Sequence, residues 1–459
     1  MNKTVVINVV GLTRRLIGDA TPRIKAFLEA GDAADIAPVL PGVTCTAQST
    51  YLTGKLPKDH GIVGNGWYFK TECEVKFWRQ SNRLVQGRKI WEVLKEKDPA
   101  FTCANMFWWY NMYSTVDYSV TPRPNYLADG RKIPDSYSFP PELRDELQDA
   151  LGQFPLFHFW GPKTTIRSSQ WIADASVATD RKYDPTLTLI YLPHLDYNLQ
   201  RYGLDFSRIS KDLSEIDQVV GGLIDHYQHA GVRIILLSEY GITDVDRPVH
   251  LNRVFRKLGW LGIRRERGLE LLDAGASEVF AVADHQIAHI YLKDPSKTEE
   301  VRKILEEVPG VGEVLSGDGI REAGLAHSRC GDLVAVADER SWFTYYYWED
   351  DAVAPDFART VDIHKKPGYD PVELFTDPAD PLVIPKVALK LLRKKMGFRT
   401  VMDLIPLKAE LVRGSHGRIP EDSLDYPIFI TNQKLPELTT FRAQDVYDLI
   451  LKTVSESVD

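Results

Sequence analysis

Three short apolar runs constrain the fold more than any other feature, because none of them shows the alternation of a half-exposed strand. They lie at residues 4–10, 187–192 and 233–238. Such runs are typical of strands that are buried on both faces of a parallel sheet. Amphipathic helical patterns follow the first two runs and end at Gly31 and Gly231. The alternation predicts a doubly wound, mostly parallel α/β sheet flanked by helices, with ligands beyond the carboxyl ends of its strands.

The length of 459 residues suggests two or three domains. We predict an α/β core over residues 1–250, a smaller α+β lobe over 251–350, and a return to the core over 351–459 that carries His416. An aromatic-rich insertion is expected at about 67–184 within the core. Its aromatic side chains could form a pocket wall that stacks on a flat substrate group. Packing is the favoured interpretation, because most aromatic residues are buried in cores.

Composition excludes some partners and indicates a compartment. A net charge of -8 argues against a broad electrostatic surface for nucleic acid or an anionic membrane, so neither partner is expected. The four cysteines have neither CxxC spacing nor the density of a secreted disulfide scaffold, and they are expected to be reduced. The apolar stretch at 4–12 is too short to span a membrane, and no cleavage site follows it. A cytoplasmic location is therefore expected.

The stretch 41–65, PGVTCTAQSTYLTGKLPKDHGIVGN, is the strongest candidate for a site. Thr44 follows a Pro-Gly turn and is expected to open a helix, where exposed backbone N–H groups favour an anion. Gly54, Pro57 and His60 then mark a return loop that ends at Asn65. A threonine at a helix start is by itself more often structural, so the surrounding pattern carries the argument.

That pattern resembles the nucleotide pyrophosphatase/phosphodiesterase branch of the alkaline phosphatase superfamily. The matching residues, in the family's order, are Thr44, Thr53-Gly54, Pro57, His60-Gly61-Ile62 and Asn65. The resemblance implies an alkaline phosphatase-like fold and a small-molecule substrate, either a phosphate ester or a nucleotide-like compound. It also implies that Thr44 attacks phosphorus and that Asn65 holds a non-bridging phosphate oxygen.

The resemblance extends thinly over nearly the whole chain and implies a set of metal ligands. The family's Pro-x-x-Asp turn matches the segment that ends at Asp196, and its Ser-Asp-His-Gly motif corresponds to Ser238-Glu239-Tyr240-Gly241. A late Ser-His-Gly, which supplies a histidine ligand in phosphonoacetate hydrolase and its relatives, matches the segment around His416. The resemblance thus implies Asp196, Glu239 and His416 as ligands.

Three departures from the family pattern reduce the expected metal centre. Val10 stands where the family has an aspartate, while Gln200 and Tyr240 stand where it has histidines. Zinc needs three or four nitrogen, oxygen or sulfur donors, and valine offers none. We therefore expect one divalent cation, zinc, rather than two, and we expect Tyr240 and Gln200 to contact the substrate instead.

Other residues could compensate for the lost ligands. His194 lies two residues before Asp196, a spacing that shares a face along a strand. His364 is followed by Lys365, which would suit a phosphate group. His285 and His289 flank a predicted strand, and a lone histidine is more often structural than a ligand.

Three functions fit these residues. The first is a metal-dependent phosphodiesterase/pyrophosphatase-type hydrolase with Thr44 as nucleophile and a reduced metal site. The second is a hydrolase in which Glu239 acts as general base and Tyr240 donates to a substrate oxygen. The third is a non-catalytic protein that keeps the fold and binds phosphate or nucleotide. The two hydrolases together are favoured, because the expected nucleophile and several of its partners are present.

Overall fold

The computed structural model describes residues 1–128 and 131–455. Its centre is a nine-stranded sheet in the order β23-β2-β22-β11-β1-β10-β5-β6-β9. The strands are β1 (Thr4–Val9), β2 (Asp32–Ala37), β5 (Cys103–Met106), β6 (Tyr118–Pro122), β9 (Ser136–Phe139), β10 (Leu187–Leu192), β11 (Arg233–Leu237), β22 (Ile428–Thr431) and β23 (Thr440–Arg442). The five strands from β11 to β6 are parallel, whereas β22 and β9 run antiparallel to their neighbours. The predicted doubly wound α/β architecture is therefore confirmed.

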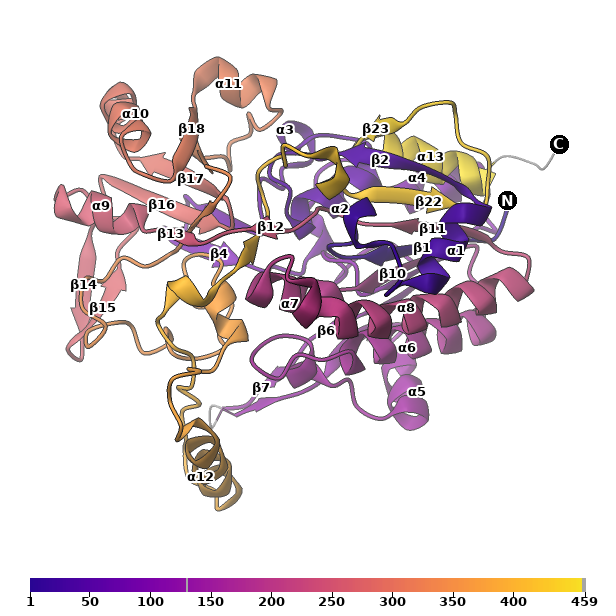
Figure 1. The fold of residues 1–459 in the computed structure, drawn as a ribbon, viewed down its shortest axis with the longest axis horizontal. Coiled ribbons are helices and arrows are strands. Elements are labelled where there is room, and N and C mark those ends of the chain that lie inside the picture. Colours follow the sequence, from indigo (N-terminus) through magenta and orange to yellow (C-terminus); the bar gives the residue numbers. More distant parts are fainter. Residues whose placement is uncertain (129–130, 456–459) are drawn as a thin grey trace.

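Helices cover both faces of this sheet (Figure 1). One group packs together through α8, and another through α13. The first group is α1 (Pro22–Ala30), α6 (Arg167–Tyr183), α7 (His194–Tyr202) and α8 (Phe206–His229), and the second is α2 (Thr44–Thr53), α4 (Ile90–Lys97) and α13 (Asp445–Ser455). The apolar runs seen in the sequence explain this layering, since every residue of β1 and β10 is buried.

The register of the central strands fixes where a site can form. Val9 at the end of β1 pairs with Leu192 at the end of β10, and Asn8 pairs with Leu237 at the end of β11. The loops that follow these three strands therefore leave the same edge of the sheet. Ligands of open α/β sheets bind at this edge.

A second, four-stranded antiparallel sheet forms a smaller lobe beside the first (Figure 1). Its elements are β16 (Val279–Asp284), β17 (Ile287–Leu292), β18 (Val311–Leu315), β19 (Leu333–Ala337), α9 (Leu251–Lys257), α10 (Thr298–Glu306) and α11 (Gly317–Glu322). It has a hydrophobic core of its own, which includes the aromatic run at 345–348. The segment at 67–184 supplies β5, β6 and β9 to the main sheet, and the C-terminal segment returns to that sheet as β22 and β23. In the aromatic segment, Trp67, Phe107 and Trp108 are buried, as the packing interpretation expects.

Short elements connect these layers. They are α3 (Pro57–His60), β3 (Gly66–Phe69), β4 (Glu74–Phe77), β7 (Asn125–Tyr126), β8 (Lys132–Ile133), α5 (Glu142–Leu151), β12 (Thr243–Asp244), β13 (Arg247–Val249), β14 (Ile263–Glu266), β15 (Leu269–Leu272), β20 (Ser341–Phe343), α12 (Val383–Lys395) and β21 (Gly414–Ser415). Helix α12 projects from the body of the molecule and has no buried residue (Figure 1). Within the described residues, no helix combines the length and the apolar content needed to cross a membrane.

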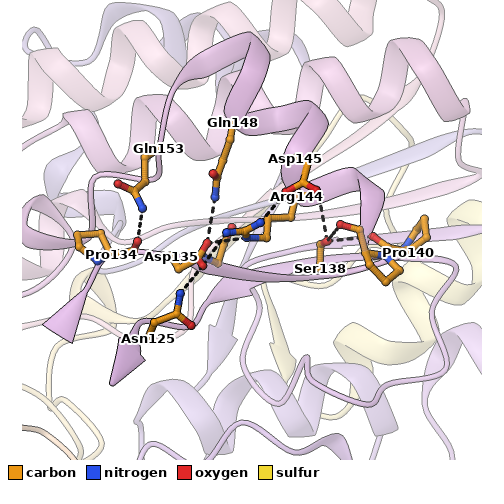
Figure 2. A network of polar contacts seen from close by, with 11 residues as sticks. Asn125, Pro134, Asp135, Ser138, Pro140, Arg144, Asp145, Gln148 and Gln153 are labelled. Atoms are coloured by element: carbon orange, nitrogen blue, oxygen red, sulfur yellow. Dashed lines mark hydrogen bonds and ion pairs between the residues drawn. The ribbon is translucent and has the colours of Figure 1, made fainter. Parts of the chain in front are cut away.

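A polar network fastens α5 to the edge of the main sheet, as Figure 2 shows. The Asp135 carboxylate is at its centre and accepts hydrogen bonds from Arg144 (2.7 Å), Asn125 (2.7 Å) and Gln148 (3.0 Å). Burial alone would raise the pKa of Asp135, but the hydrogen bonds from Arg144 and from backbone and amide groups hold it below its ordinary value. The ionised carboxylate is thus the form that the fold stabilises.

Replacing Asp135 tests this network. Because Arg144 would lose its buried partner, Asp135→Asn should lower the free energy of unfolding at neutral pH by about 1–3 kcal/mol. A depressed carboxyl pKa contributes stability that is lost as the pH falls through the folded value, so wild type and variant should converge in acid. Chemical denaturation at several pH values measures both effects. Asp145→Asn, which alters an exposed partner of Arg144, is the control, and an equal loss in both variants would contradict the prediction.

Candidate active site

Thr44 is the first residue of α2, as the sequence predicts, and only 3% of it is exposed. The return loop holds Asn65 against this helix start, because the Cys45 backbone N–H donates to the Asn65 side-chain oxygen (3.0 Å). His60 fixes the loop: its Nδ1 accepts from the Ile62 N–H (3.1 Å), and its Nε2 is 3.1 Å from the Thr50 hydroxyl. The His-Gly-Ile motif therefore has a structural role here, which is to bring Asn65 back to the nucleophile candidate.

Asp284 anchors Asn65 from the other side. It ends β16 in the smaller lobe and accepts from the backbone N–H of Asn65 (2.7 Å) and from its side-chain amide (3.0 Å). Burial raises the pKa of Asp284 to about 7, against the lowering effect of these two hydrogen bonds. Asp284 is not among the candidates predicted from the sequence, since no motif marks it. The only available signal was an acidic residue in the turn between two buried apolar strands.

Asp196 lies in the first turn of α7. Its carboxylate accepts hydrogen bonds from Tyr240 and Gln200, the two residues that replace histidines of the family pattern. Its Oδ1 accepts from the Tyr240 hydroxyl (3.2 Å), and its Oδ2 accepts from the Gln200 amide one helical turn later (2.8 Å). The Gln200 oxygen in turn accepts from the Tyr369 hydroxyl (3.1 Å). Burial raises the pKa of Asp196 to about 7, although the hydrogen bonds from Gln200 and Tyr240 oppose the shift. Gln200 therefore orients a carboxylate in this structure.

The Tyr240 hydroxyl is also 3.2 Å from the Thr44 hydroxyl. Because its single proton goes to Asp196, it accepts the proton of Thr44. The three side chains thus form a directed chain of hydrogen bonds from Thr44 through Tyr240 to Asp196. Tyr240 follows β11, which places its phenol at the carboxyl edge of the sheet.

His416 approaches the same point from the C-terminal segment. It follows β21, which pairs with β12 just after Tyr240, and the neighbouring Gly417 carbonyl accepts from the Gly42 N–H (2.8 Å). The His416 Nδ1 donates to the Gly42 carbonyl (2.7 Å), so Nε2 keeps its lone pair. That Nε2 is buried, lacks a hydrogen-bond partner among the described residues, and lies 3.9 Å from the Asp196 Oδ1. Burial lowers the pKa of His416 to about 3, so the imidazole is neutral.

Four stacked rings fill the centre of the site. Tyr240 lies on His416 with ring centroids 3.6 Å apart and an interplanar angle of 5°. His416 lies 3.6 Å from His285, and His285 lies 3.7 Å from Tyr369. No ring in this column is more than 4% exposed. His285, one of the lone histidines of the sequence analysis, is thus part of the site.

Glu239 is buried beside this column but has different partners. One carboxylate oxygen accepts from the side-chain amides of Asn8 on β1 and Gln48 on α2, and the other has no partner among the described residues. Burial raises the pKa of Glu239 to about 8, against the effects of Gln48, Asn8 and Thr44. The Thr44 hydroxyl therefore lies within reach of both Glu239 and the Tyr240 hydroxyl.

The expected metal ligands differ in how well they are placed to bind a cation. Two ligands of one tetrahedral zinc ion lie about 3.4 Å apart when each bond is about 2.1 Å, so Asp196 and His416 need only a small shift to bind one ion. Glu239 does not complete this pair, since these three residues do not gather their ligand atoms within 4.8 Å of one another. Val10 is fully buried and offers no donor. Of the three expected ligands, Asp196 and His416 approach each other, whereas Glu239 does not join them.

The weaker sequence candidates lie elsewhere. The His194 Nε2 faces Asp212 (3.4 Å) and Glu215 (3.3 Å) on α8. His364 donates to the Phe77 carbonyl (3.5 Å). Lys365 is exposed and pairs with Asp362 (3.4 Å). Within the described residues, none of the three candidates makes a hydrogen bond or ion pair with Thr44, Asn65 or Asp196.

A helix-opening threonine, an asparagine beside it and a buried Asp–His pair thus meet at the carboxyl edge of this sheet. The family model described as type I phosphodiesterase / nucleotide pyrophosphatase matches residues 4–370. The chain belongs to this family.

Individual relatives are distant. An uncharacterized pyrophosphatase/phosphodiesterase of Schizosaccharomyces pombe is 25% identical over 232 residues, which span 48% of this chain and 40% of that protein. Human ectonucleotide pyrophosphatase/phosphodiesterase 5 has a TM-score of 0.60 at 15% identity, with 100% of this chain and 96% of that chain covered. An inactive threonine-to-alanine variant of the murine enzyme, solved in complex with AMP, has the same score, identity and coverage.

Phosphonoacetate hydrolase from Sinorhizobium meliloti, in complex with phosphonoacetate, has a TM-score of 0.60 at 14% identity over 99% of this chain and 96% of that chain. At these identities the solved structures show a shared fold. The predicted resemblance to the pyrophosphatase/phosphodiesterase branch is confirmed by the family match.

The buried carboxyl groups predict an unusual pH dependence of the metal-free protein. A carboxyl whose folded pKa lies above its unfolded value of about 4 takes up a proton on folding, so the free energy of unfolding falls as pH rises. The pH range over which this stability is lost ends at the folded-state pKa of each carboxyl, which is about 7 for Asp196, about 7 for Asp284 and about 8 for Glu239. Glu239→Gln should flatten this slope and gain roughly 1–3 kcal/mol at the alkaline end. Chemical denaturation in the presence of a chelator measures it, and a slope identical to that of wild type would refute the shift at Glu239.

Proposed function

We propose that the protein is a metal-dependent hydrolase of the phosphodiesterase/pyrophosphatase type, with Thr44 as nucleophile and a metal site reduced to one cation. The single observation that carries the proposal is the chain of hydrogen bonds from Thr44 through Tyr240 to Asp196, with 3.2 Å at each step. It supplies what a threonine nucleophile needs, namely a route for its proton.

The chain of hydrogen bonds can activate Thr44 without a histidine. As the Thr44 oxygen attacks phosphorus and the leaving oxygen departs, the Thr44 proton moves to the Tyr240 oxygen while the Tyr240 proton moves to Asp196. Burial holds the pKa of Tyr240 well above its ordinary value, so Tyr240 passes a proton on and does not persist as a tyrosinate. Without a cation, burial raises the pKa of Asp196 to about 7, which suits a proton acceptor near neutral pH, whereas a cation bound to this carboxylate would lower that pKa. Water then cleaves the phosphothreonine.

The substrate we propose is a small phosphate ester or nucleotide-like compound. The start of α2 presents backbone N–H groups to an anion next to Thr44, and the Asn65 amide lies beside them. Asp284 fixes the orientation of that amide. AMP and phosphonoacetate are bound by proteins that share this fold, and both are small anions containing phosphorus.

A divalent cation would be held by Asp196 and His416, with water or substrate oxygens needed as its further ligands, and zinc suits this nitrogen and oxygen donor pair. When bound, it neutralises negative charge on phosphoryl oxygens. Gln200 orients Asp196 toward it through the amide hydrogen bond. Lys365 and His364 have no part in this proposal, because their contacts lie with Asp362 and Phe77.

One observation favours a second function, a non-catalytic phosphate-binding or nucleotide-binding protein. The rings of Tyr240, His416, His285 and Tyr369 lie close together and are buried, whereas a cavity of about 450 Å³ lies in the smaller lobe near His250. A substrate would have to displace part of that column. The losses at Val10 and Tyr240 fit this alternative as well.

We also propose a reducing, cytoplasmic compartment. All four cysteines are free, and Cys45, Cys103 and Cys330 are buried. Burial raises the pKa of all three thiols, which leaves them protonated and unreactive. Thiols of this kind are typical of reduced proteins.

Replacing Thr44 separates the two functions. With Zn²⁺ or Mn²⁺ added, hydrolysis of a chromogenic phosphodiester should fall about 10³-fold or more in Thr44→Ala, because the nucleophile is removed. Thr44→Ser keeps a hydroxyl and is the matched control, in which part of the activity should remain. Full activity in Thr44→Ala would overturn the assignment of the nucleophile. Wild type that binds AMP but turns over no phosphodiester with any cation would establish the binding function instead.

The role of Tyr240 is tested by Tyr240→Phe, which keeps the stacked ring and removes the hydroxyl. The expected result is a loss of about 10²–10⁴-fold in kcat with unchanged metal content, because the route for the Thr44 proton is broken. Tyr369→Phe is the control: the Tyr369 hydroxyl donates to Gln200 and makes no other hydrogen bond among the described residues, so a smaller loss is expected. Equal kcat values in wild type and Tyr240→Phe would exclude the proton route.

A further inference from the structure

His194, Asp212 and Glu215 gather on the side of α7 that packs against α8. His194 begins α7, while Asp212 and Glu215 lie three residues apart on one face of α8. The His194 Nε2 is 3.4 Å from the Asp212 Oδ1 and 3.3 Å from the Glu215 Oε2. Among the described residues, this is the one group that brings three metal-binding atoms within 4.8 Å of one another.

The His194 side chain is the second observation that points to a ligand. It is 2% exposed, and neither of its ring nitrogens makes an aligned hydrogen bond to any described residue. Buried polar atoms in folded proteins are almost always paired, so an unpaired Nε2 that faces two carboxylates calls for a missing partner. The Asn198 amide donates to Asp212 (2.7 Å) and orients it. Glu215 is partly exposed, with 28% of its side chain open to solvent, which gives an ion a way in.

We propose that His194, Asp212 and Glu215 form a divalent-cation site that is separate from the site at Thr44. One imidazole nitrogen and two carboxylate oxygens suit Zn²⁺ or Mn²⁺, with water in the remaining positions. The cation ties the start of α7 to α8. Because Asp196 and Gln200 lie on α7, the ion also steadies the carboxylate that ends the hydrogen-bond chain from Thr44. The site does not depend on Thr44 being a nucleophile.

Metal titration of the full-length protein tests this site. Zn²⁺ or Mn²⁺ alone is titrated by calorimetry into chelator-treated wild type, Glu215→Gln, Asp212→Asn and Lys211→Ala. Glu215→Gln should lose one binding event or weaken it at least tenfold, because a charged ligand becomes a neutral one. Lys211→Ala is the matched control: Lys211 lies 3.4 Å from the other Glu215 oxygen and is no ligand, so its stoichiometry should equal that of wild type.

His416→Ala distinguishes the two cation sites. It should remove the event that belongs to Asp196 and His416 and leave the one that Glu215→Gln removes. If Asp212→Asn does not fold, the test rests on Glu215→Gln. Glu215 is partly exposed, so its substitution is expected to leave the fold intact. Equal stoichiometry and affinity in wild type and Glu215→Gln would overturn the proposal, whatever the activity of Thr44 variants.

A different observation concerns α12 and the residues that flank it. The helix projects from the molecule and buries no residue, yet it is rich in large apolar side chains that are between 45% and 77% exposed (Figure 1). They are Leu382, Ile384, Leu389, Leu391, Leu392, Met396, Phe398 and Val401. A contiguous exposed apolar patch on a soluble fold marks an interaction site.

The same helix is strongly basic. At 100° per residue, Lys386, Lys390, Arg393 and Lys394 share one arc, while Ile384, Leu391 and Leu392 lie on another that also contains Lys395. Lys386 and Lys390 pair with Asp380 and Asp403, whereas Arg393, Lys394 and Lys395 have no acidic partner among the described residues. The charge of this segment is therefore opposite to the net charge of the chain.

We infer that α12 binds an anionic lipid surface and lies in its interface plane. Basic residues along one arc and leucines along the other match anionic headgroups and acyl chains at the same time. The negative surface of a cytoplasmic leaflet supplies the complementary charge. This binding mode needs no helix that crosses the bilayer.

Vesicle sedimentation tests this surface with the full-length protein. Wild type should sediment with vesicles of phosphatidylcholine and phosphatidylserine, less with phosphatidylcholine alone, and less at high salt. Leu391→Asp with Leu392→Asp should abolish binding, while Phe157→Asp with Leu258→Asp, at exposed apolar residues elsewhere, should not. Binding that survives the α12 change, or no binding by wild type, would overturn the inference. Self-association that the α12 change abolishes would make a second copy the occupant and would equally overturn it.

Discussion

The candidate site depends on the hydrogen bonds of the Tyr240 hydroxyl. It joins Thr44 on α2 to Asp196 on α7, and its ring lies flat on His416 from the C-terminal segment. These groups come from parts of the chain that are far apart in sequence. They meet because β1, β10 and β11 run parallel and in register, so that the loops after them emerge together. The Tyr240 side chain therefore contacts residues from three separate segments at this edge of the sheet.

Burial sets the electrostatic character of the site. Asp196, Glu239 and Asp284 are all removed from water without a cationic side chain bound to them, and the pKa of each is raised. Elsewhere in the molecule a buried charge is balanced: Lys366 lies 2.7 Å from Asp370 and 2.8 Å from Glu373. The contrast matters because uncompensated buried carboxylates are costly and concentrate at functional sites. A proton or a cation must supply the missing positive charge.

The sequence predicted the sheet and the Thr44 turn, since buried apolar runs and local turn residues are read without tertiary context. The sequence did not predict the contacts that depend on how distant elements pack against one another. Asp284 reaches Asn65 only because the smaller lobe packs against the core. His194 was expected to share a face with Asp196 on the assumption of a strand, but the chain enters α7 directly after Pro193. Helical periodicity then turns these two side chains apart, and His194 faces α8.

The departures from the family pattern are coupled to one another. Gln200 donates to Asp196 and accepts from Tyr369, and Tyr240 donates to the same carboxylate. Two positions that bind metal in the pattern therefore supply neutral hydrogen-bond donors to one acid. Neutral donors stabilise a carboxylate less than a cation does, which agrees with the raised pKa of Asp196. A carboxylate poised in this way can take up a proton near neutral pH as long as no cation is bound to it.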